Sequence, residues 1–505
     1  MKLLTLILFY FYAAYSFQSA NENPPIAKVG PITITRSEFQ TRYELTPGLQ
    51  RHRNMDENKK EFLLSLIAEK ILVLQAREEG LESDSILLSS LHEVEKNLVR
   101  DELYRREISG KVTIPENEIE SAVRKSSVDY KVYFLFLKTQ READSVYREI
   151  VRGQPLESFS SKIFRIPNGD MDSAIARWGD IDERMEKVVY SMKLNQTSQP
   201  FELDDGWYIV KIMGKVVSFI EGETEKKTQR EKVISILRQR KEIKRMNQYM
   251  SDELKTTKTE INSDLFKSVV LHLWEAAKEE RASRDSFVFS IDNSVRAKLF
   301  SLMKNSLGSP WIIYPQGTWS LEKTIDKIIS SNLAVPDPTY QSIYFSIEQR
   351  LKDLIDQEYL TRRGYALKLN LTAAVQNDMK TWHDEYLAQR MRKIIGDTIV
   401  VNETEVKDFQ RLFQSDSMIS HNDSIAAEKC TALKRENSID KVVGSRAAHT
   451  TIRIYSDNLN NTEVTRAPSL VYRLLGFGGR MFAAPFVQPQ IGWIRYWNRN
   501  DSVLP

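Results

Sequence analysis

Three blocks of sequence in the first quarter of this chain return, in the same order, in its second half. Each block combines apolar residues at helical spacing with turn residues at matching places, and three ordered matches are hard to produce by chance. We therefore expect one helical module to be built twice. The matching blocks are 30–43 with GTWSLEKTIDKI (317–328), LLSLIAEKILVLQAREEGL (63–81) with LKDLIDQEYLTRRGYALKL (351–369), and 98–123 with 382–409.

The first copy carries clear start and stop signals. IAKVGPITI predicts a short hairpin, after which Thr35 or Ser37 is expected to cap a helix. Apolar residues at helical spacing between 62 and 74 predict a long helix that Gly80 ends. Further helices are expected over about 86–108 and from Pro115.

The first sixteen residues have the pattern of a secretory signal peptide. After Met1-Lys2 comes LLTLILFYFYAAYS, an uncharged apolar run that ends in small residues. We expect cleavage after Ser16, and an uncleaved membrane anchor is the alternative, although the run is short for a span. The chain is therefore expected to be exported.

Composition narrows the class of function. The 505 residues suffice for three or four domains, and 41% hydrophobic with 28% charged residues is typical of globular domains. A net charge of only +3 argues against a broad nucleic-acid surface. Cys430 is the only cysteine, so no internal disulfide can form, and no zinc site is expected. No metal, cofactor or small-molecule ligand is predicted.

A compact α/β segment, about 128–216, separates the two copies. It begins with the apolar strand YKVYFLFLK and ends with the hairpin ELDDGWYIVKIMGKV, with helices between them. A long charged helix follows over about 225–254, and we interpret its basic residues as a solvated face rather than an RNA or membrane surface. The last segment, 412–505, shows only one possible strand, in TTIRIYSDN.

This order of modules resembles the SurA/PpiC group of exported parvulin-type peptidyl-prolyl isomerases and chaperones. The resemblance covers roughly 24–250, and 311–410 through the repeat. It extends over many weak positions rather than one sharp motif, and LNQTSQPFELDDGWYIVK is the most family-like stretch. It implies a mainly helical α+β fold: a SurA-like N-terminal module that is repeated later in the chain, plus a small parvulin-like α/β domain.

The resemblance also points to site residues, and here the chain departs from the family. Phe134 stands where the family's first strand carries a histidine, and Tyr208 stands at the second histidine, in GWYIVKI. No histidine lies between His92 and His272, so realignment cannot restore the pair. Asp172 falls where the family often has an aspartate or cysteine. The family's GDLG turn appears as GDID, which ends with Ile181 and Asp182, and Met185 takes an apolar prolyl-pocket position.

Prolyl isomerisation does not need a histidine in principle. The barrier of about 18–20 kcal/mol is crossed without breaking a covalent bond, because the catalyst need only favour a twisted amide. An apolar wall and one or two hydrogen-bonding groups suffice. The predicted catalytic residues are Asp172 and Tyr208, and the predicted substrate-binding residues are Phe134, Ile181, Met185, Phe201 and Asp205.

Each of these residues also has a plainer interpretation. The apolar ones can be ordinary core, Asp172 can be a helix cap or a solvated loop residue, and Tyr208 can simply pack. Three functions therefore stay open. The chain is an isomerase of exported unfolded chains, a holding chaperone that grips peptide without turnover, or a scaffold without clients. The two helical modules would form a cradle with an apolar, methionine-containing surface.

The expected clients are unfolded exported polypeptides and X–Pro peptides, above all outer-membrane protein precursors in the periplasm of a Gram-negative-type envelope. The expected divisions are a signal peptide (1–16), an N-terminal chaperone module (24–125), a parvulin-like domain (126–216), a helical connector (225–310), a second helical module (311–411), and a C-terminal segment (412–505) that is a degenerate or truncated second parvulin-like domain.

Overall fold

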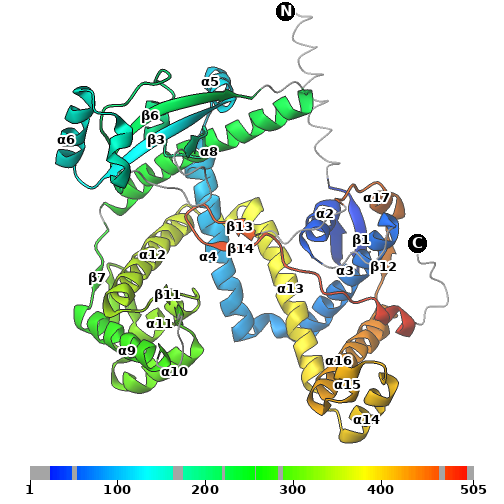
Figure 1. Ribbon diagram of the computed structural model, residues 1–505. Coiled ribbons are helices and arrows are strands. Elements are labelled where there is room, and N and C mark those ends of the chain that lie inside the picture. The colour runs from blue at the N-terminus through cyan, green and yellow to red at the C-terminus, as the bar shows by residue number, and fades with distance from the viewer. Residues whose placement is uncertain are drawn as a thin grey trace, which may run out of the picture. The chain divides into compact units, whose positions relative to one another are not determined.

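The computed structural model describes residues 23–47, 54–162, 174–218, 222–255, 257–281, 288–465 and 472–497 (Figure 1). The fold is mainly helical with small sheets, as predicted. The chain divides into two compact units, a larger one formed by 1–105 with 258–505 and a smaller one formed by 106–257. Among the described residues, no helix is long and apolar enough to cross a membrane. The predicted signal peptide lies outside them.

In the larger unit the two copies of the repeat begin with the same elements. A hairpin leads into a short helix in both, and the caps are equivalent: Thr35 accepts a hydrogen bond from the Glu38 amide, and Ser320 accepts one from the Lys323 amide. Gly80, with a φ of +74°, follows the first long helix as predicted. The first copy comprises β1 (Pro25–Val29), β2 (Ile32–Thr35), α2 (Arg36–Leu45), α3 (Met55–Glu78) and α4 (Ser85–Glu107), followed by α5 (Glu116–Ser126). The second comprises β9 (Pro310–Tyr314), β10 (Gly317–Ser320), α11 (Leu321–Ile329), α12 (Tyr340–Ala366) and α13 (Ala373–Asp397), followed by α14 (Glu403–Leu412).

The long helices of the two copies pair reciprocally. The first long helix of one copy packs on the second long helix of the other, so that α3 lies on α13 and α4 lies on α12. Polar contacts accompany both pairs. Arg100 donates to the Thr361 hydroxyl at 2.7 Å, and Lys70 donates to Asp384 at 2.9 Å. The sequence repeat is therefore also a repeat of contacts.

Gly364 provides a test of the α4–α12 contact. A Cβ there would lie 2.4 Å from Val99 Cγ1, so Gly364→Ala is expected to lower the free energy of unfolding by about 1–3 kcal/mol through overpacking. Gly396→Ala in α13 is the matched control, since its nearest neighbour, in Arg435, would be 3.5 Å away. That change is expected to be neutral or stabilising, because alanine favours helix. Urea unfolding of both variants decides, and equal effects would contradict close packing at Gly364.

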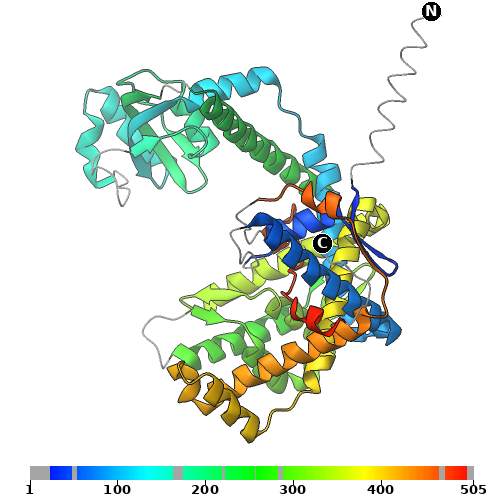
Figure 2. The same ribbon diagram turned by 90° about the vertical axis from the view of Figure 1, so that its right-hand side faces the viewer.

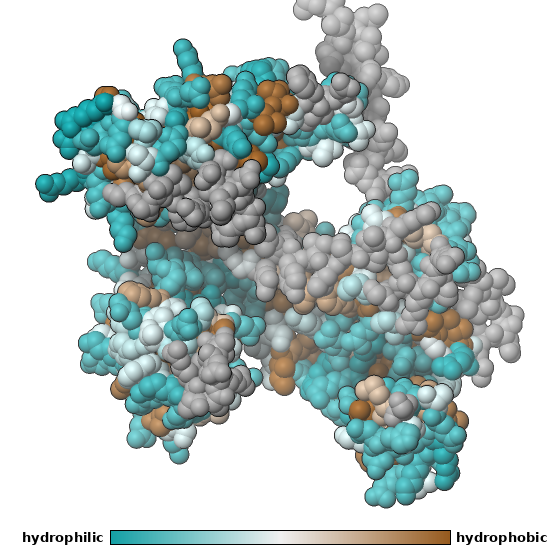
Figure 3. Space-filling model, in the orientation of Figure 1, coloured by the Kyte–Doolittle hydropathy of each residue, from teal (hydrophilic) through white to brown (hydrophobic). Residues whose placement is uncertain are grey.

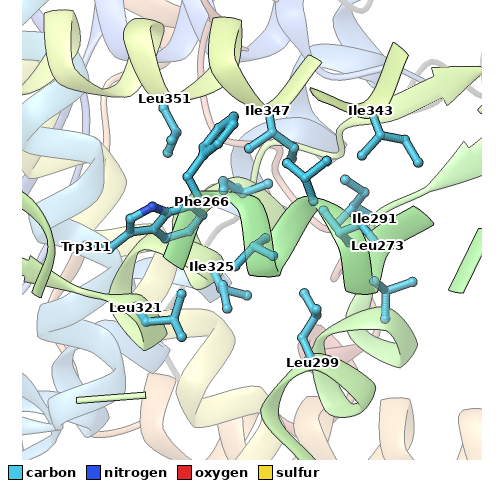
Figure 4. Packing of buried hydrophobic residues seen from close by; sticks show 14 of the residues in the cluster. Phe266, Leu273, Ile291, Leu299, Trp311, Leu321, Ile325, Ile343, Ile347 and Leu351 are labelled. Carbon is cyan, nitrogen blue, oxygen red and sulfur yellow. The ribbon is translucent and has the colours of Figure 1, made fainter. Parts of the chain in front are cut away.

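The predicted boundary at residue 310 is not a structural boundary. Helices α9 (Ser263–Arg281) and α10 (Asn293–Leu302) share one apolar core with β9, α11 and the first half of α12 (Figure 4). Two short sheets lie at the edge of this core. In one of them β7 (Glu260–Ile261) pairs with β9, and in the other β8 (Val288–Ser290) pairs with β11 (Ala334–Pro336). The residues labelled in Figure 4 are Phe266, Leu273, Ile291, Leu299, Trp311, Leu321, Ile325, Ile343, Ile347 and Leu351.

The C-terminal segment requires a larger correction. Its described residues form helices and short strands, without the four-stranded sheet that a second parvulin-like domain would need. Instead, β12 (Ile452–Ile454) pairs with β1 and adds a third strand to the first hairpin (Figure 1). The elements are α15 (Ser417–Ser420), α16 (Asp423–Ala447), β12, α17 (Ser456–Asn460), β13 (Tyr472–Leu474), β14 (Arg480–Phe482) and a 3-10 turn, Gly492–Tyr496.

The reason for this return is that the first module leaves apolar surface and a strand edge to be covered. Trp493 is fully buried, and its indole N–H donates to the Leu64 carbonyl at 3.3 Å. The Gln490 amide donates to the Ser65 hydroxyl, and Arg42 donates to the Pro485 carbonyl. The end of the chain thus completes the core of its beginning.

The smaller unit contains the predicted parvulin-like segment. Its antiparallel sheet has the order β4-β3-β6-β5, with β3 (Val128–Leu137) and β6 (Gly206–Val217) at the centre and β4 (Ala174–Ala176) and β5 (Phe201–Leu203) at the edges. Helix α6 (Gln140–Val151) and the turn Leu156–Lys162 cover one face. Near the other face lies α7 (Glu183–Val189).

The long charged helix α8 (Glu223–Leu254) is part of this unit. It packs against α5, and Figure 2 shows it extending away from the small sheet. Val233 and Leu237 are buried against Trp178 and the apolar side of α5. Two of its basic residues pair with α5: Arg230 with Glu116, and Lys241 with Glu118. The prediction of a helix with a solvated face therefore holds only for part of its surface.

Candidate functional site

Strand pairing gathers four aromatic side chains on one face of the small sheet. Phe136 lies opposite Tyr208 on β6, and Phe201 on β5 lies opposite Tyr208 from the other side. Phe134 is two residues from Phe136, so it points to the same face. The Tyr208 ring centroid is 5.4 Å from that of Phe136, 6.1 Å from Phe134 and 6.2 Å from Phe201.

Two more predicted residues join this group from outside the sheet. Ile181 follows the Gly179 turn, and Met185 lies on α7, whose first turn is capped by Asp182. Both pack on the apolar cluster that includes Phe134 and Phe201. All four are half-buried, so they contribute to the core and still present apolar surface. We call Phe134, Phe136, Ile181, Met185, Phe201 and Tyr208 the aromatic face.

Tyr208 places a polar atom beside this apolar surface. Its ring is buried, and its hydroxyl donates to Asp205 Oδ2 at 2.8 Å. Burial, together with the hydrogen bond to Asp205, raises the pKa of Tyr208 to about 12. The hydroxyl is therefore neutral at physiological pH and can donate or accept a hydrogen bond, but it cannot act as a phenolate base.

The turn that carries Asp205 depends on a glycine. Gly206 has a φ of +151°, and a Cβ there would lie 2.7 Å from the ring of Phe136. Only glycine lets the β5–β6 turn approach the ring this closely. The predicted partner Asp172 lies outside the described residues, so a shared groove with Tyr208 stays a prediction.

Sequence reasoning missed the contacts that fix the turn before Ile181. Gly179, with a φ of +91°, donates its amide N–H to Glu186 Oε2 at 2.9 Å. Arg240 on α8 binds both oxygens of Glu186, at 2.9 and 2.7 Å, and lies over the Trp178 ring. Glu186 and Arg240 are 54 residues apart, so no local spacing could have indicated this pair.

A cavity of about 470 Å³ lies elsewhere in the same unit, between α8 and the turn at Trp178. Most of the residues that line it are polar, and they include the ion pair of Asp129 with Arg177, at 3.1 Å. None of the predicted site residues that the structure describes lines it. Among the described residues, no group of three or more histidine, cysteine, aspartate or glutamate side chains is placed to hold a metal.

The chain has low sequence identity to two curated parvulin-like proteins. No family model matches the chain. The parvulin-like PPIase of Rickettsia typhi is 23% identical over 192 residues, which are 35% of this chain and 68% of that protein. The parvulin-like PPIase of Rickettsia prowazekii is 23% identical over 233 residues, which are 43% of this chain and 82% of that protein.

Two solved structures are similar over part of the chain. The peptidylprolyl isomerase PrsA from Bacillus anthracis is 15% identical, with a TM-score of 0.22, and the match covers 37% of this chain and 96% of that one. A SurA-like chaperone of Campylobacter jejuni is 14% identical, with a TM-score of 0.22, and covers 47% of this chain and 100% of that one.

Proposed function

We propose that this chain, which resembles the SurA/PpiC group of parvulin-type peptidyl-prolyl isomerases and chaperones, is an exported folding factor that binds unfolded polypeptide at the aromatic face and isomerises X–Pro bonds there. The observation that carries the proposal is that Phe134 and Phe201, whose rings lie near that of Tyr208, share one apolar cluster with Ile181 and Met185. Four residues singled out from the sequence lie together, next to one polar group.

The chemistry of X–Pro rotation suits such a surface. When the amide twists it loses conjugation, its carbonyl oxygen becomes less negative and its nitrogen becomes pyramidal. An apolar wall that takes the proline ring and excludes water favours this less polar state. A hydroxyl near the nitrogen can donate a hydrogen bond that exists only in the twisted amide, which is what lowers a barrier. In the free chain the one hydroxyl proton of Tyr208 is donated to Asp205 Oδ2, so the O–H must turn from Asp205 to the amide nitrogen for this role.

The second candidate is a holding chaperone that binds peptide without turnover. Phe134 and Tyr208 occupy both positions of the family's histidines, and the Tyr208 hydroxyl already has Asp205 as its acceptor. A client amide would compete with that bond. In this case the aromatic face supplies grip through burial of apolar area, worth about 25 cal/mol per Å².

We place this grip on the aromatic face, because on the side that Figure 3 shows the helical modules present no large apolar surface. Over the side of the molecule in Figure 3, hydrophilic residues predominate and the apolar residues form small patches. Exposed apolar side chains scattered in this way are normal for soluble proteins. We extend the proposal to clients and compartment as the sequence suggests them, namely outer-membrane protein precursors in the periplasm.

The decisive measurement is prolyl cis/trans exchange in a short Leu–Pro peptide, followed by NMR with the full chain. Tyr208→Phe keeps the ring and removes only the hydroxyl, so it is expected to lower the acceleration about tenfold or more while peptide affinity changes little. Asp172→Ala is expected to lower it as well.

Other outcomes decide among the alternatives. Peptide binding and suppressed aggregation of an unfolded outer-membrane protein, without acceleration, would assign the holding function. Absence of both binding and suppression would leave only a scaffold without clients and would overturn the proposal.

A further inference from the structure

Asp205 has no cationic partner among the described residues, unlike the adjacent Asp204. Its neighbour Asp204 pairs with Arg184 at 3.0 Å, and Arg184 also pairs with Asp182 at 3.1 Å. Nothing positive in the described part of the chain pairs with Asp205, although its side chain is exposed. Its negative charge is therefore left to solvent or to whatever binds at the aromatic face.

The surroundings of this carboxylate also favour a cation. Asp205 Oδ2 accepts the hydrogen bond of Tyr208, whose ring centroid lies 5.4 Å from Phe136 and 6.2 Å from Phe201. The faces of aromatic rings carry negative electrostatic potential and attract ammonium and guanidinium groups. A carboxylate beside half-buried aromatic rings thus provides two attractions for one positive side chain, and both of them disfavour a negative one.

We infer that the aromatic face prefers client segments with a lysine or arginine next to the proline, and that Asp205 sets this preference. The inference rests on the proposed function, because it assumes that clients bind at this face. The hydrogen bond from Tyr208 fixes the carboxylate close to the hydroxyl that would face the amide. A basic side chain one residue before the proline is within reach of the same turn, while a glutamate there meets Asp205 as a like charge.

The preference is measurable with three blocked peptides, Ala-Arg-Pro-Phe, Ala-Leu-Pro-Phe and Ala-Glu-Pro-Phe. Affinities are read by NMR titration of the full chain at low ionic strength. We expect the order Arg, Leu, Glu from tightest to weakest. An exposed ion pair and a cation–π contact each contribute modestly, so each step is expected to be about two- to fivefold. At 1 M salt the differences shrink, because exposed charges are screened.

Matched variants assign the preference to one residue. Asp205→Asn is expected to reduce the Arg-to-Glu affinity ratio to within about twofold, and Asp205→Glu is expected to keep the order because it keeps the charge. Asp204→Asn is the control: it removes the same charge from the same turn, at a side chain that Arg184 already neutralises, and is expected to leave the ratio intact.

Each outcome decides a separate question. Equal binding of the Arg and Leu peptides to the unmodified chain would overturn the inference and leave the proposed function standing. An unchanged Arg-to-Glu affinity ratio in Asp205→Asn would also overturn the inference. Loss of binding of the Leu peptide in that variant would overturn it too, because Asp205 would then maintain the structure of the aromatic face rather than select charge. Failure of all three peptides to bind the unmodified chain would instead count against the proposed function.

Discussion

Trp493→Ala is expected to lower the free energy of unfolding of the larger unit by about 3–5 kcal/mol. The side chain is fully buried, its indole donates to the Leu64 carbonyl, and its ring lies 5.4 Å from that of Trp497. Truncation removes the apolar area, leaves a cavity beneath α16 and removes the hydrogen bond from the indole to the Leu64 carbonyl. Urea unfolding, together with hydrogen exchange of amides in α3, measures the effect.

Tyr496→Ala is the matched control for this prediction. It lies in the same 3-10 turn and removes a ring of similar size, but 38% of Tyr496 is exposed. We expect a cost of about 1 kcal/mol, since most core burial is absent there. If the two variants are equally stable, the C-terminal segment does not belong to the core of the first module. If only Trp493→Ala speeds hydrogen exchange of the α3 amides, the segment around Trp493 and the first helices unfold as one cooperative structure.

Local features of this fold were predictable because their causes lie within a few residues. Thr35 caps a helix through the amide of Glu38, and Gly80 ends a helix through its own positive φ. The repeat predicted that the hairpin and the long helices would recur, and they do. None of these signals depends on what the helices touch.

Contacts between distant segments were not predictable in the same way. The reciprocal pairing of α3 with α13 and of α4 with α12 leaves no periodic trace in either copy. The three residues of β12 pair with β1 across more than 400 positions, and a strand this short matches too many patterns to be assigned a partner. For this reason the sequence pattern predicts a separate C-terminal domain, whereas β12 adds a strand to the first hairpin.

The candidate site shows the same division. Period-two alternation places Phe134 and Phe136 on one face, so the gathering of apolar residues around Tyr208 follows from the strand pattern once the resemblance has aligned the strands. The contacts of Glu186 and Arg240 at the Gly179 turn do not follow from the strand pattern. Arg240 lies on a helix that the sequence alone places outside the parvulin-like segment.

Glu69→Gln is the second change with a large expected effect, about 3–5 kcal/mol of lost stability. Glu69 is almost fully buried and accepts hydrogen bonds from Arg42 at 2.6 Å and from Lys70 at 3.1 Å. Burial opposes its ionisation, but the charges of Arg42 and Lys70 outweigh burial and hold the pKa of Glu69 far below its usual range. The variant would leave two buried cations short of a counter-charge.

Glu385→Gln, in the same cluster, is expected to cost less than about 1 kcal/mol at pH 5 and to become stabilising at pH 7, because the variant folds without the proton uptake that Glu385 requires above pH 4.5. Burial, and then the negative charge of Glu69, raise the pKa of Glu385 to about 8. Its carboxyl is therefore mostly protonated at pH 7 while it accepts a hydrogen bond from Arg42 at 3.0 Å. Glutamine has the same shape and charge as that protonated form, so the hydrogen bond survives and no counter-charge is lost.

The pH dependence of stability separates the two glutamates. Because the folded pKa of Glu385 lies above its ordinary value of 4.5, the native state holds a proton that the unfolded chain releases between pH 4.5 and about 8. Its contribution to stability is complete below pH 4.5 and declines as pH rises to about 8, by up to about 1.4 kcal/mol per pH unit. Glu69, whose pKa is lowered, is ionised in both states over that window and does not change the free energy of unfolding with pH there.

Urea unfolding at pH 5, 6, 7 and 8 should therefore show a free energy of unfolding that declines in the unmodified chain and not in Glu385→Gln. An unchanged decline, or a loss at pH 7 as large as that of Glu69→Gln, would mean that Glu385 is ionised in its buried position.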